Sequence, residues 1–311
     1  MRVVFAGTPR FSVACLDALM HTDGMDVVGV VSQPDRKSGR GMKLTPSAVK
    51  QAALDSGIDV ITPACLRDNG DALAWLQGKQ ADVLVVVAFG MILPETWLNA
   101  VTIAPLNVHA SLLPRWRGAA PIERSLLAGD RQTGVCIMQM EKGLDTGGVY
   151  ARRTVPITDQ TTGADLWRSL APMGAELLAE TLPKIEAGLQ PRPQAEQGVT
   201  YAHKICNEER IISWNKSASE IDRLVRCFSP RPGVRTRCHS KWLKLIAGKP
   251  LPSTHRSSNG AVVETTHGLD IACGDASVYR ITELQPEGKK AMSATDFLRG
   301  AQMYSSAMLG T

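Results

Sequence analysis

The sequence has no apolar run long enough to cross a bilayer, and its first residues lack the apolar core and cleavage site of a signal peptide. From both absences we expect a cytoplasmic protein. There is no internal repeat or low-complexity segment. The cysteines form neither CxxC pairs nor a disulfide-like framework, so we expect reduced and mostly buried thiols. They are Cys15, Cys65, Cys136, Cys206, Cys227, Cys238 and Cys273.

Motifs for common cofactors are also missing. The turn after the first apolar run, Gly7-Thr8-Pro9, has neither the GxGxxG spacing of a dinucleotide site nor the Lys-Ser/Thr ending of a P-loop. We therefore expect no nicotinamide or ATP site. No second histidine stands at metal-ligand spacing from His109, and we predict no metal in a catalytic centre.

Charge is distributed unevenly along the 311 residues. Residues 1–188 hold 18 Lys+Arg against 19 Asp+Glu, whereas residues 189–311 hold 17 against 11, so the net charge of +5 comes from the second part. Within it, residues 204–256 carry 12 basic and 4 acidic side chains. The asymmetry favours a domain that faces phosphates. A basic surface that serves only solubility gives the same pattern.

Apolar patterning predicts strands that alternate with helices over residues 1–188. The strands are expected at Arg2–Ala6, Val27–Ser32 and Asp82–Ala88, and the last is so apolar that both of its faces should be covered. Thr8 is a candidate cap for the helix that follows the first strand. Further helices are expected near 46–56, 69–78, 121–128 and 161–187. This order predicts an α/β fold with a doubly wound, largely parallel sheet and ligands at the carboxyl ends of its strands.

The remaining chain has a different pattern. Residues 189–203 are rich in Gln, Pro and Gly and are predicted to be a linker. Residues 204–311 contain a predicted helix near 217–228 and short strands at 261–265, 269–273 and 277–284. Short strands separated by turns are typical of a small β-barrel.

Candidate catalytic residues gather in two segments. Along a strand, alternation places Asn107, His109 and Ser111 on one face, and Asp145 lies in the Gly-rich segment 141–148. An amide can stabilise a developing oxyanion, an imidazole can take up a proton, and a carboxylate can orient that imidazole. These groups suit the transfer of an acyl-like carbon to an amine. By spacing alone, a structural His, a turn-forming Asn and an ordinary loop Asp explain the same residues equally well.

The longer motifs carry a family resemblance. The segment 107–121, NVHASLLPRWRGAAP, closely resembles the methionyl-tRNA formyltransferase family, within the wider class of formyltransferases that use 10-formyltetrahydrofolate. The resemblance covers almost the whole chain in a shared order. Its other segments are FAGTP (5–9), QPDR (33–36), GRG (39–41), AFGMILP (88–94), GLDTG (143–147), TYA (200–202) and GKKAMS (288–293).

The resemblance implies a Rossmann-like formyltransferase domain followed by an OB-like barrel. It assigns catalysis to Asn107, His109 and Asp145, and places segments 88–93 and 138–145 around the folate. Folate contacts are expected from Ser111, Leu112, Leu113, Pro114, Phe89 and Gly90. The segment 33–44 corresponds to a flexible loop that the family directs at the tRNA acceptor stem, ordering on binding. The expected tRNA contacts are Arg36, Lys37, Arg40, Lys43, Arg235 and Lys241.

The resemblance also implies a co-substrate and partners. We expect 10-formyltetrahydrofolate as formyl donor, initiator methionyl-tRNA as acceptor and a monomeric enzyme of translation initiation. The sequence departs from the family at residues 228–236, where Arg231 and Arg235 replace expected aromatics. Three alternatives share some of these features: a sugar-nucleotide formyltransferase, a single-domain glycinamide ribonucleotide formyltransferase and a non-catalytic RNA-binding protein. The basic C-terminal part disfavours the second, and the intact Asn, His and Asp disfavour the third.

Overall fold

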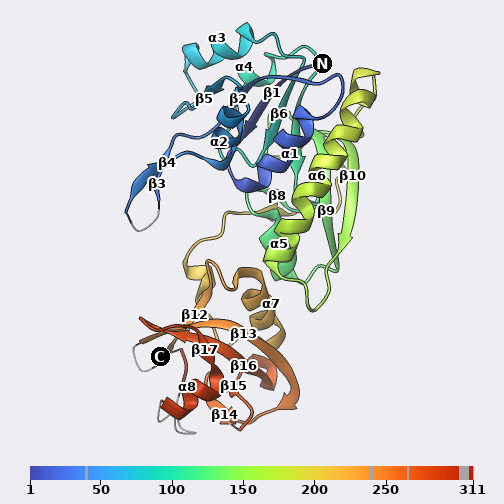
Figure 1. The fold of residues 1–311 in the computed structure, drawn as a ribbon. Coiled ribbons are helices and arrows are strands. Elements are labelled where there is room, and N and C mark those ends of the chain that lie inside the picture. The colour runs from blue at the N-terminus through green and yellow to red at the C-terminus, as the bar shows by residue number, and fades with distance from the viewer. Residues whose placement is uncertain (39–40, 239–240, 265, 301–307, 311) are drawn as a thin grey trace. The chain divides into compact units, whose positions relative to one another are not determined.

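The computed structural model describes the chain except residues 39–40, 239–240, 265, 301–307 and 311 (Figure 1). It separates into two compact units. The second unit includes two short segments from the first 188 residues, and the segment 189–203 belongs to the first unit. The first unit comprises Met1–Ile122, Gln132–Pro156 and Trp167–Lys204, and the second comprises Glu123–Arg131, Ile157–Leu166 and Ile205–Thr311.

A seven-stranded sheet in the order β10-β9-β7-β6-β1-β2-β5 forms the centre of the first unit (Figure 1). The strands from β7 to β5 run parallel, and β9 and β10 run antiparallel at one edge. The largely parallel sheet that the sequence predicted is confirmed. The strands are β1 (Arg2–Gly7), β2 (Asp26–Val31), β5 (Val60–Ile61), β6 (Val83–Val87), β7 (Ala104–His109), β9 (Gln132–Gln139) and β10 (Val149–Pro156).

Helices connect these strands close to the predicted positions. Side chains of Ser47 and Asn69 accept backbone N–H bonds at the starts of two of them. The predicted cap at Thr8 is wrong: Pro9 occupies the N-cap of the first helix, and the Thr8 hydroxyl donates to the carbonyl of Phe89 at 2.8 Å. The helices are α1 (Arg10–Met20), α2 (Ala48–Asp55), α3 (Gly70–Gly78), α4 (Glu95–Leu98), α5 (Pro121–Ala128) and α6 (Gly163–Glu186).

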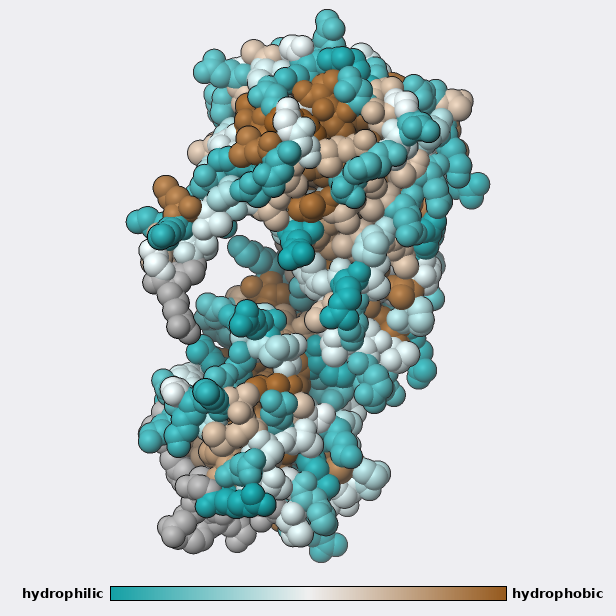
Figure 2. All heavy atoms as spheres, viewed as in Figure 1, coloured by the Kyte–Doolittle hydropathy of each residue, from teal (hydrophilic) through white to brown (hydrophobic). Residues whose placement is uncertain are grey.

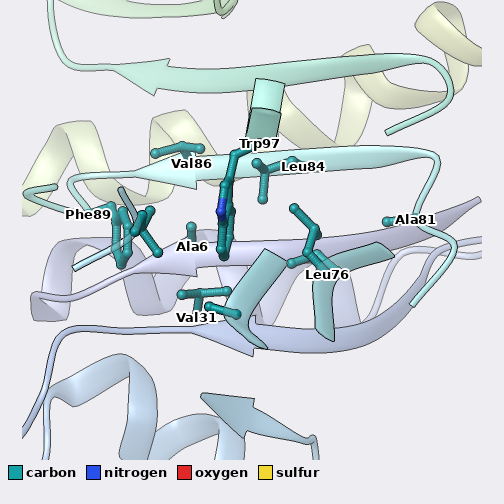
Figure 3. Packing of buried hydrophobic residues seen from close by; sticks show 11 residues of the cluster. Ala6, Val31, Leu76, Ala81, Leu84, Val86, Phe89 and Trp97 are labelled. Carbon is teal, nitrogen blue, oxygen red and sulfur yellow. The ribbon is translucent and has the colours of Figure 1, made fainter. Parts of the chain in front are cut away.

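The apolar core covers both faces of the sheet. On one face, Leu76 of α3 and Trp97 of α4 pack over the strands that carry Ala6, Val31 and Val86 (Figure 3). On the other face α6 lies close to β7, because a Cβ atom added at Gly174 would be 2.9 Å from Cγ1 of Val108. All five residues of β6 are buried, as their uniformly apolar sequence predicted.

An antiparallel β sheet and one helix dominate the second unit. Its strands run in the order β12-β13-β16-β15-β14, with β17 beside β16. Backbone N–H groups of Leu309 and Gly310 donate to the carbonyls of Gly260 and Arg237, so the C-terminal segment bridges the two edges as barrel closure requires. The elements are α7 (Ala218–Phe228), β12 (Val234–Cys238), β13 (Lys241–Thr254), β14 (Val262–Glu264), β15 (Leu269–Ala272), β16 (Ser277–Pro286), β17 (Met292–Ser293) and α8 (Ala294–Gly300).

The predicted helix of this unit is confirmed, and its longest strand was missed. A capping box between Ser217 and Glu220 begins α7. The strand β13 contains Gly248, Pro250 and Pro252, residues that commonly interrupt strands. Register shifts against β16 accommodate them.

All seven cysteines lie in the described part of the chain as free thiols, and five are buried. Burial raises the pKa of the Cys15 thiol to about 12. Of the helices that the structure describes, none is both long and apolar enough to cross a membrane.

Candidate active site

Two of the candidate catalytic residues lie at the carboxyl end of β7. Asn107 pairs with Val86 on one side and Met138 on the other, and His109 pairs with Cys136. Alternation puts Asn107 and His109 on the same face of the sheet, as predicted. The extension of this pattern to Ser111 is wrong, because β7 ends at His109. The hydroxyl of Ser111 donates instead to the carbonyl of Arg115 at 2.7 Å.

The fold brings Asp145 to these two residues. Its Oδ1 accepts from Nδ2 of Asn107 at 3.2 Å, and its Oδ2 accepts from the backbone N–H of Gly118 at 2.8 Å. The same Oδ2 lies 3.7 Å from Nδ1 of His109. The side chain of Asp145 is 14% exposed and that of His109 is 5% exposed, so this charge lies in a largely dry setting where its interactions are strengthened.

The imidazole of His109 is also held at its second nitrogen, Nε2. Its Nε2 lies 2.9 Å from the carbonyl oxygen of Trp116. A carbonyl can only accept, so Nε2 carries the hydrogen. The neutral ring therefore has its lone pair at Nδ1, on the side of Asp145.

Strained backbone conformations mark the same region. Ala88, Trp116 and Asp145 have φ values of 44°, 69° and 52°, in the left-handed region that non-glycine residues rarely adopt. Such strain persists only where surrounding contacts enforce it and is concentrated at functional sites. Beside Asp145 the chain needs a glycine, because a Cβ at Gly147 would be 2.0 Å from the carbonyl oxygen of Gln139.

Two groups of supporting residues were missed at the sequence level. Arg117, Gln194 and Thr200 hold the segments that carry Trp116 and Asp145. Thr8 and Gln33 both donate to the carbonyl of Phe89, at 2.8 and 2.9 Å. The only available signal for Arg117 was its place inside the motif 107–121, and the position of Gln194 in a Gln- and Pro-rich segment gave none.

The predicted folate residues follow the carboxyl ends of β6 and β7 along the chain and differ in solvent exposure. Side chains of Ser111, Leu113 and Phe89 are buried, those of Leu112 and Pro114 are half-buried, and Gly90 is exposed. Two large apolar side chains are solvent-exposed nearby in sequence: Ile92 at 86% and Leu144 at 57%. They belong to segments 88–93 and 138–145, which the resemblance places around the folate.

The described residues of the basic segment 33–44, which the sequence predicted to be a flexible loop, include two short strands that pair as a hairpin. Strand β3 (Arg36–Ser38) pairs with β4 (Lys43–Thr45), and Lys37 faces Leu44 in the register. Arg36, Lys37 and Lys43 are exposed. Arg40 lies outside the described residues. Met42 and Leu44 are 61% and 68% exposed, so the hairpin presents apolar as well as basic groups (Figure 2).

In the second unit, the predicted contacts Arg235 and Lys241 lie exposed on β12 and β13. Guanidinium groups of Arg235 and Arg237 lie 4.3 and 4.6 Å from the ring centre of Trp242. The two arginines thus stack on this ring in cation–π contacts. A cavity of about 450 Å³ adjoins it, with Arg210, Gly233, Arg235, Trp242, Lys244 and Gln285 among its lining residues.

Within the described ranges, no cluster of three or more His, Cys, Asp or Glu is arranged to hold a metal ion.

Comparison with known proteins agrees with the fold. Residues 1–182 match the formyl transferase family, and residues 204–302 match the formyl transferase C-terminal domain. A methionyl-tRNA formyltransferase of Marinobacter nauticus is 44% identical over 304 residues, covering 97% of both chains. One from Xanthomonas campestris is 46% identical over 301 residues, covering 96% of this chain and 97% of the relative.

A solved structure shares the fold at lower identity. The N-formyltransferase of Helicobacter canadensis, in complex with folinic acid and dTDP-3-aminofucose, has a TM-score of 0.66 at 18% identity. The match covers 91% of this chain and 98% of that one. The two domain matches and the arrangement of Asn107, His109 and Asp145 define a formyl transferase. With relatives of 44% and 46% identity over nearly its full length, the chain belongs to the methionyl-tRNA formyltransferase family.

Proposed function

We propose that the chain transfers the formyl group of 10-formyltetrahydrofolate to the α-amino group of methionyl initiator tRNA. The observation that carries the proposal is the position of Asp145 between Asn107 and His109 in a chain of this family. In the reaction the amine nitrogen forms a bond to the formyl carbon, an oxyanion develops on the formyl oxygen, and the bond to the folate N10 breaks.

Asn107 is suited to bind the developing oxyanion. Its side-chain amide carries two N–H donors, so it can hold Asp145 with one and offer the other to a substrate oxygen. The bond to Asp145 fixes the direction of the second donor. A fixed donor in a site of low solvent access contributes more to transition-state stabilisation than the same donor in water.

His109 is suited to move the proton. Attack leaves the amine nitrogen with one proton too many, and Nδ1 of the neutral imidazole can receive it. The imidazolium then lies between the Trp116 carbonyl and the Asp145 carboxylate, which offsets its charge. Return of the same proton to the departing folate nitrogen completes the reaction and regenerates the neutral ring.

Substrate binding is proposed to be divided between the two units. The segments 88–93 and 111–114 at the carboxyl ends of β6 and β7 are assigned to the folate. The exposed hairpin β3–β4 is assigned to the acceptor end of the tRNA. The basic face around Arg235 and Lys241 is assigned to the tRNA backbone, because phosphate contacts position a nucleic acid without reading its sequence.

The test is formation of formylmethionyl-tRNA by purified protein from 10-formyltetrahydrofolate and radiolabelled initiator methionyl-tRNA. A dTDP-amino sugar serves as the competing acceptor, since an N-formyltransferase in complex with dTDP-3-aminofucose shares the fold. We expect efficient formylation of the tRNA and little of the sugar. Efficient formylation of the sugar and little of the tRNA would show that the proposed acceptor is wrong, although the folate chemistry would stand. Formylation of neither acceptor would overturn the proposal.

A further inference from the structure

We propose that Gln194 is a positioning residue for the formyl transfer, which it serves by clamping the loop that carries Asp145. Gln194 lies in the Gln- and Pro-rich segment after α6, far from the catalytic residues in sequence. The inference rests on the proposed function where it is tested by activity. The contact between Gln194 and the loop is tested separately by hydrogen exchange, which needs no activity.

All hydrogen-bonding groups of the Gln194 side chain are engaged in the first unit. Its Nε2 donates to the carbonyl oxygens of Asp145 and Gly147, each at 2.8 Å. Its Oε1 accepts from Nε and Nη2 of Arg117, at 3.1 and 2.9 Å. Only this orientation of the amide matches donors to acceptors, since carbonyls cannot donate and a guanidinium cannot accept.

The loop needs such a contact because its own structure is unfavourable. Residues 141–144 are exposed, and Asp145 has a left-handed backbone. The two carbonyls that Gln194 binds belong to the peptide planes 145–146 and 147–148, so the bonds fix one plane directly after Asp145 and a second two residues further on. Without the amide, the direction of the Asp145 side chain would depend mainly on the bonds that its carboxylate accepts from Gly118 and Asn107.

The same segment also holds the opposite side of the site. The Thr200 hydroxyl accepts from the backbone N–H of Trp116 at 2.8 Å, and its carbonyl accepts from that of Arg117 at 2.9 Å. Strand β11 (Tyr201–Ala202) then pairs with β8 (Arg117–Gly118). The stretch 194–202 therefore contacts both the loop that carries Asp145 and the segment whose Trp116 carbonyl bonds the His109 ring.

A clamp of this kind should affect turnover more than substrate binding. A displacement of a catalytic group by about 1 Å can lower a rate about a hundredfold. For Gln194→Ala we expect kcat to fall about tenfold or more, with the KM values for folate and tRNA changed less than about twofold. Gln194→Glu keeps an acceptor for Arg117 but loses both donors, and it should resemble the alanine variant.

A double-mutant cycle separates this role from a general loss of stability. If Gln194 acts through Asp145, Gln194→Ala should lower kcat in the wild-type background and have little further effect in Asp145→Ala. Gln190→Ala is the matched control, because Gln190 is exposed in the same segment and bonds only locally to Gly188 among the described residues. Equal losses in both backgrounds would overturn the positioning role.

Hydrogen exchange of the peptide covering residues 141–148 tests the clamp without any activity measurement. Exchange should be faster in Gln194→Ala than in the wild type or in Gln190→Ala, because freed loops open more often. Unchanged exchange would overturn the clamp even if activity fell. A wild-type protein that does not formylate methionyl-tRNA would overturn the proposed function, and exchange would still decide the clamp.

Discussion

The carboxylate of Asp145 lies 3.7 Å from the imidazole Nδ1 of His109, although β8, α5 and β9 separate the two residues along the chain. The contact is longer than a hydrogen bond and places a negative charge beside the ring. The ring is held at its other nitrogen by the carbonyl of Trp116. A proton can therefore be received at Nδ1 without a change in the orientation of the ring.

Asn107→Ala and His109→Ala should each lower kcat by about a hundredfold or more, the scale of losing an oxyanion donor or a general base. Steady-state kinetics with methionyl-tRNA measures the effect, and circular dichroism checks the fold. His21→Ala is the control, because His21 is exposed at the end of α1. Near-normal turnover of a folded variant would withdraw the catalytic role of that residue.

The hairpin β3–β4 should matter for the tRNA and not for the folate. In the double variant Lys37→Ala/Lys43→Ala, kcat/KM for methionyl-tRNA should fall, because each change removes a cation available to phosphates. A triple variant that also carries Arg40→Ala should lower kcat/KM further. The KM for folate should stay the same. Lys184→Ala, an exposed lysine on α6, is the matched control. Unchanged kinetics with initiator and elongator tRNA would leave the hairpin as an ordinary charged surface.

The basic face of the second unit should contribute affinity that depends on salt. Arg235→Ala and Lys241→Ala should each weaken tRNA binding and reduce the slope of log K against log salt by about one. Trp242→Ala should weaken binding as well, because both Arg235 and Arg237 stack on that ring. Binding isotherms at several salt concentrations measure the slope. An unchanged slope in all three variants would show that this face does not bind phosphates.

Stability should depend on Glu209 in acid. Hydrogen bonds from the Arg124 guanidinium, one of them 3.0 Å long, lower the pKa of Glu209 from 4.5 to about 2. A depressed pKa stabilises the folded state above the unfolded value, and the contribution is lost as the pH falls from about 4.5 toward 2. Glu209→Gln should therefore lower the free energy of unfolding at pH 7, and its difference from the wild type should shrink over that range.

Urea unfolding of the two proteins at pH 7, 4.5 and 3 measures this difference. Glu208→Gln is the control, because Glu208 is the exposed neighbour. A difference between Glu209→Gln and the wild type that stays constant with pH would contradict the assigned ion pair.

The sequence alone determined the elements whose signals are local. The apolar run of β6 predicted a strand covered on both faces, and the helix predicted near 217–228 is α7. Alternation was enough to place Asn107 and His109 on one face. Such predictions succeed because backbone hydrogen bonds and side-chain periodicity depend on residues only a few positions apart.

Only the tertiary structure decided which distant groups meet. The Thr8 hydroxyl bonds to Phe89 and does not cap its helix, and Gln194 clamps the Asp145 loop from a segment whose composition predicted only a linker. Arg235 stacks on Trp242, and the two side chains come together only because β12 pairs with β13. These contacts join side chains brought together by strand order and packing, and a donor or acceptor finds its partner only once that packing has placed both in reach.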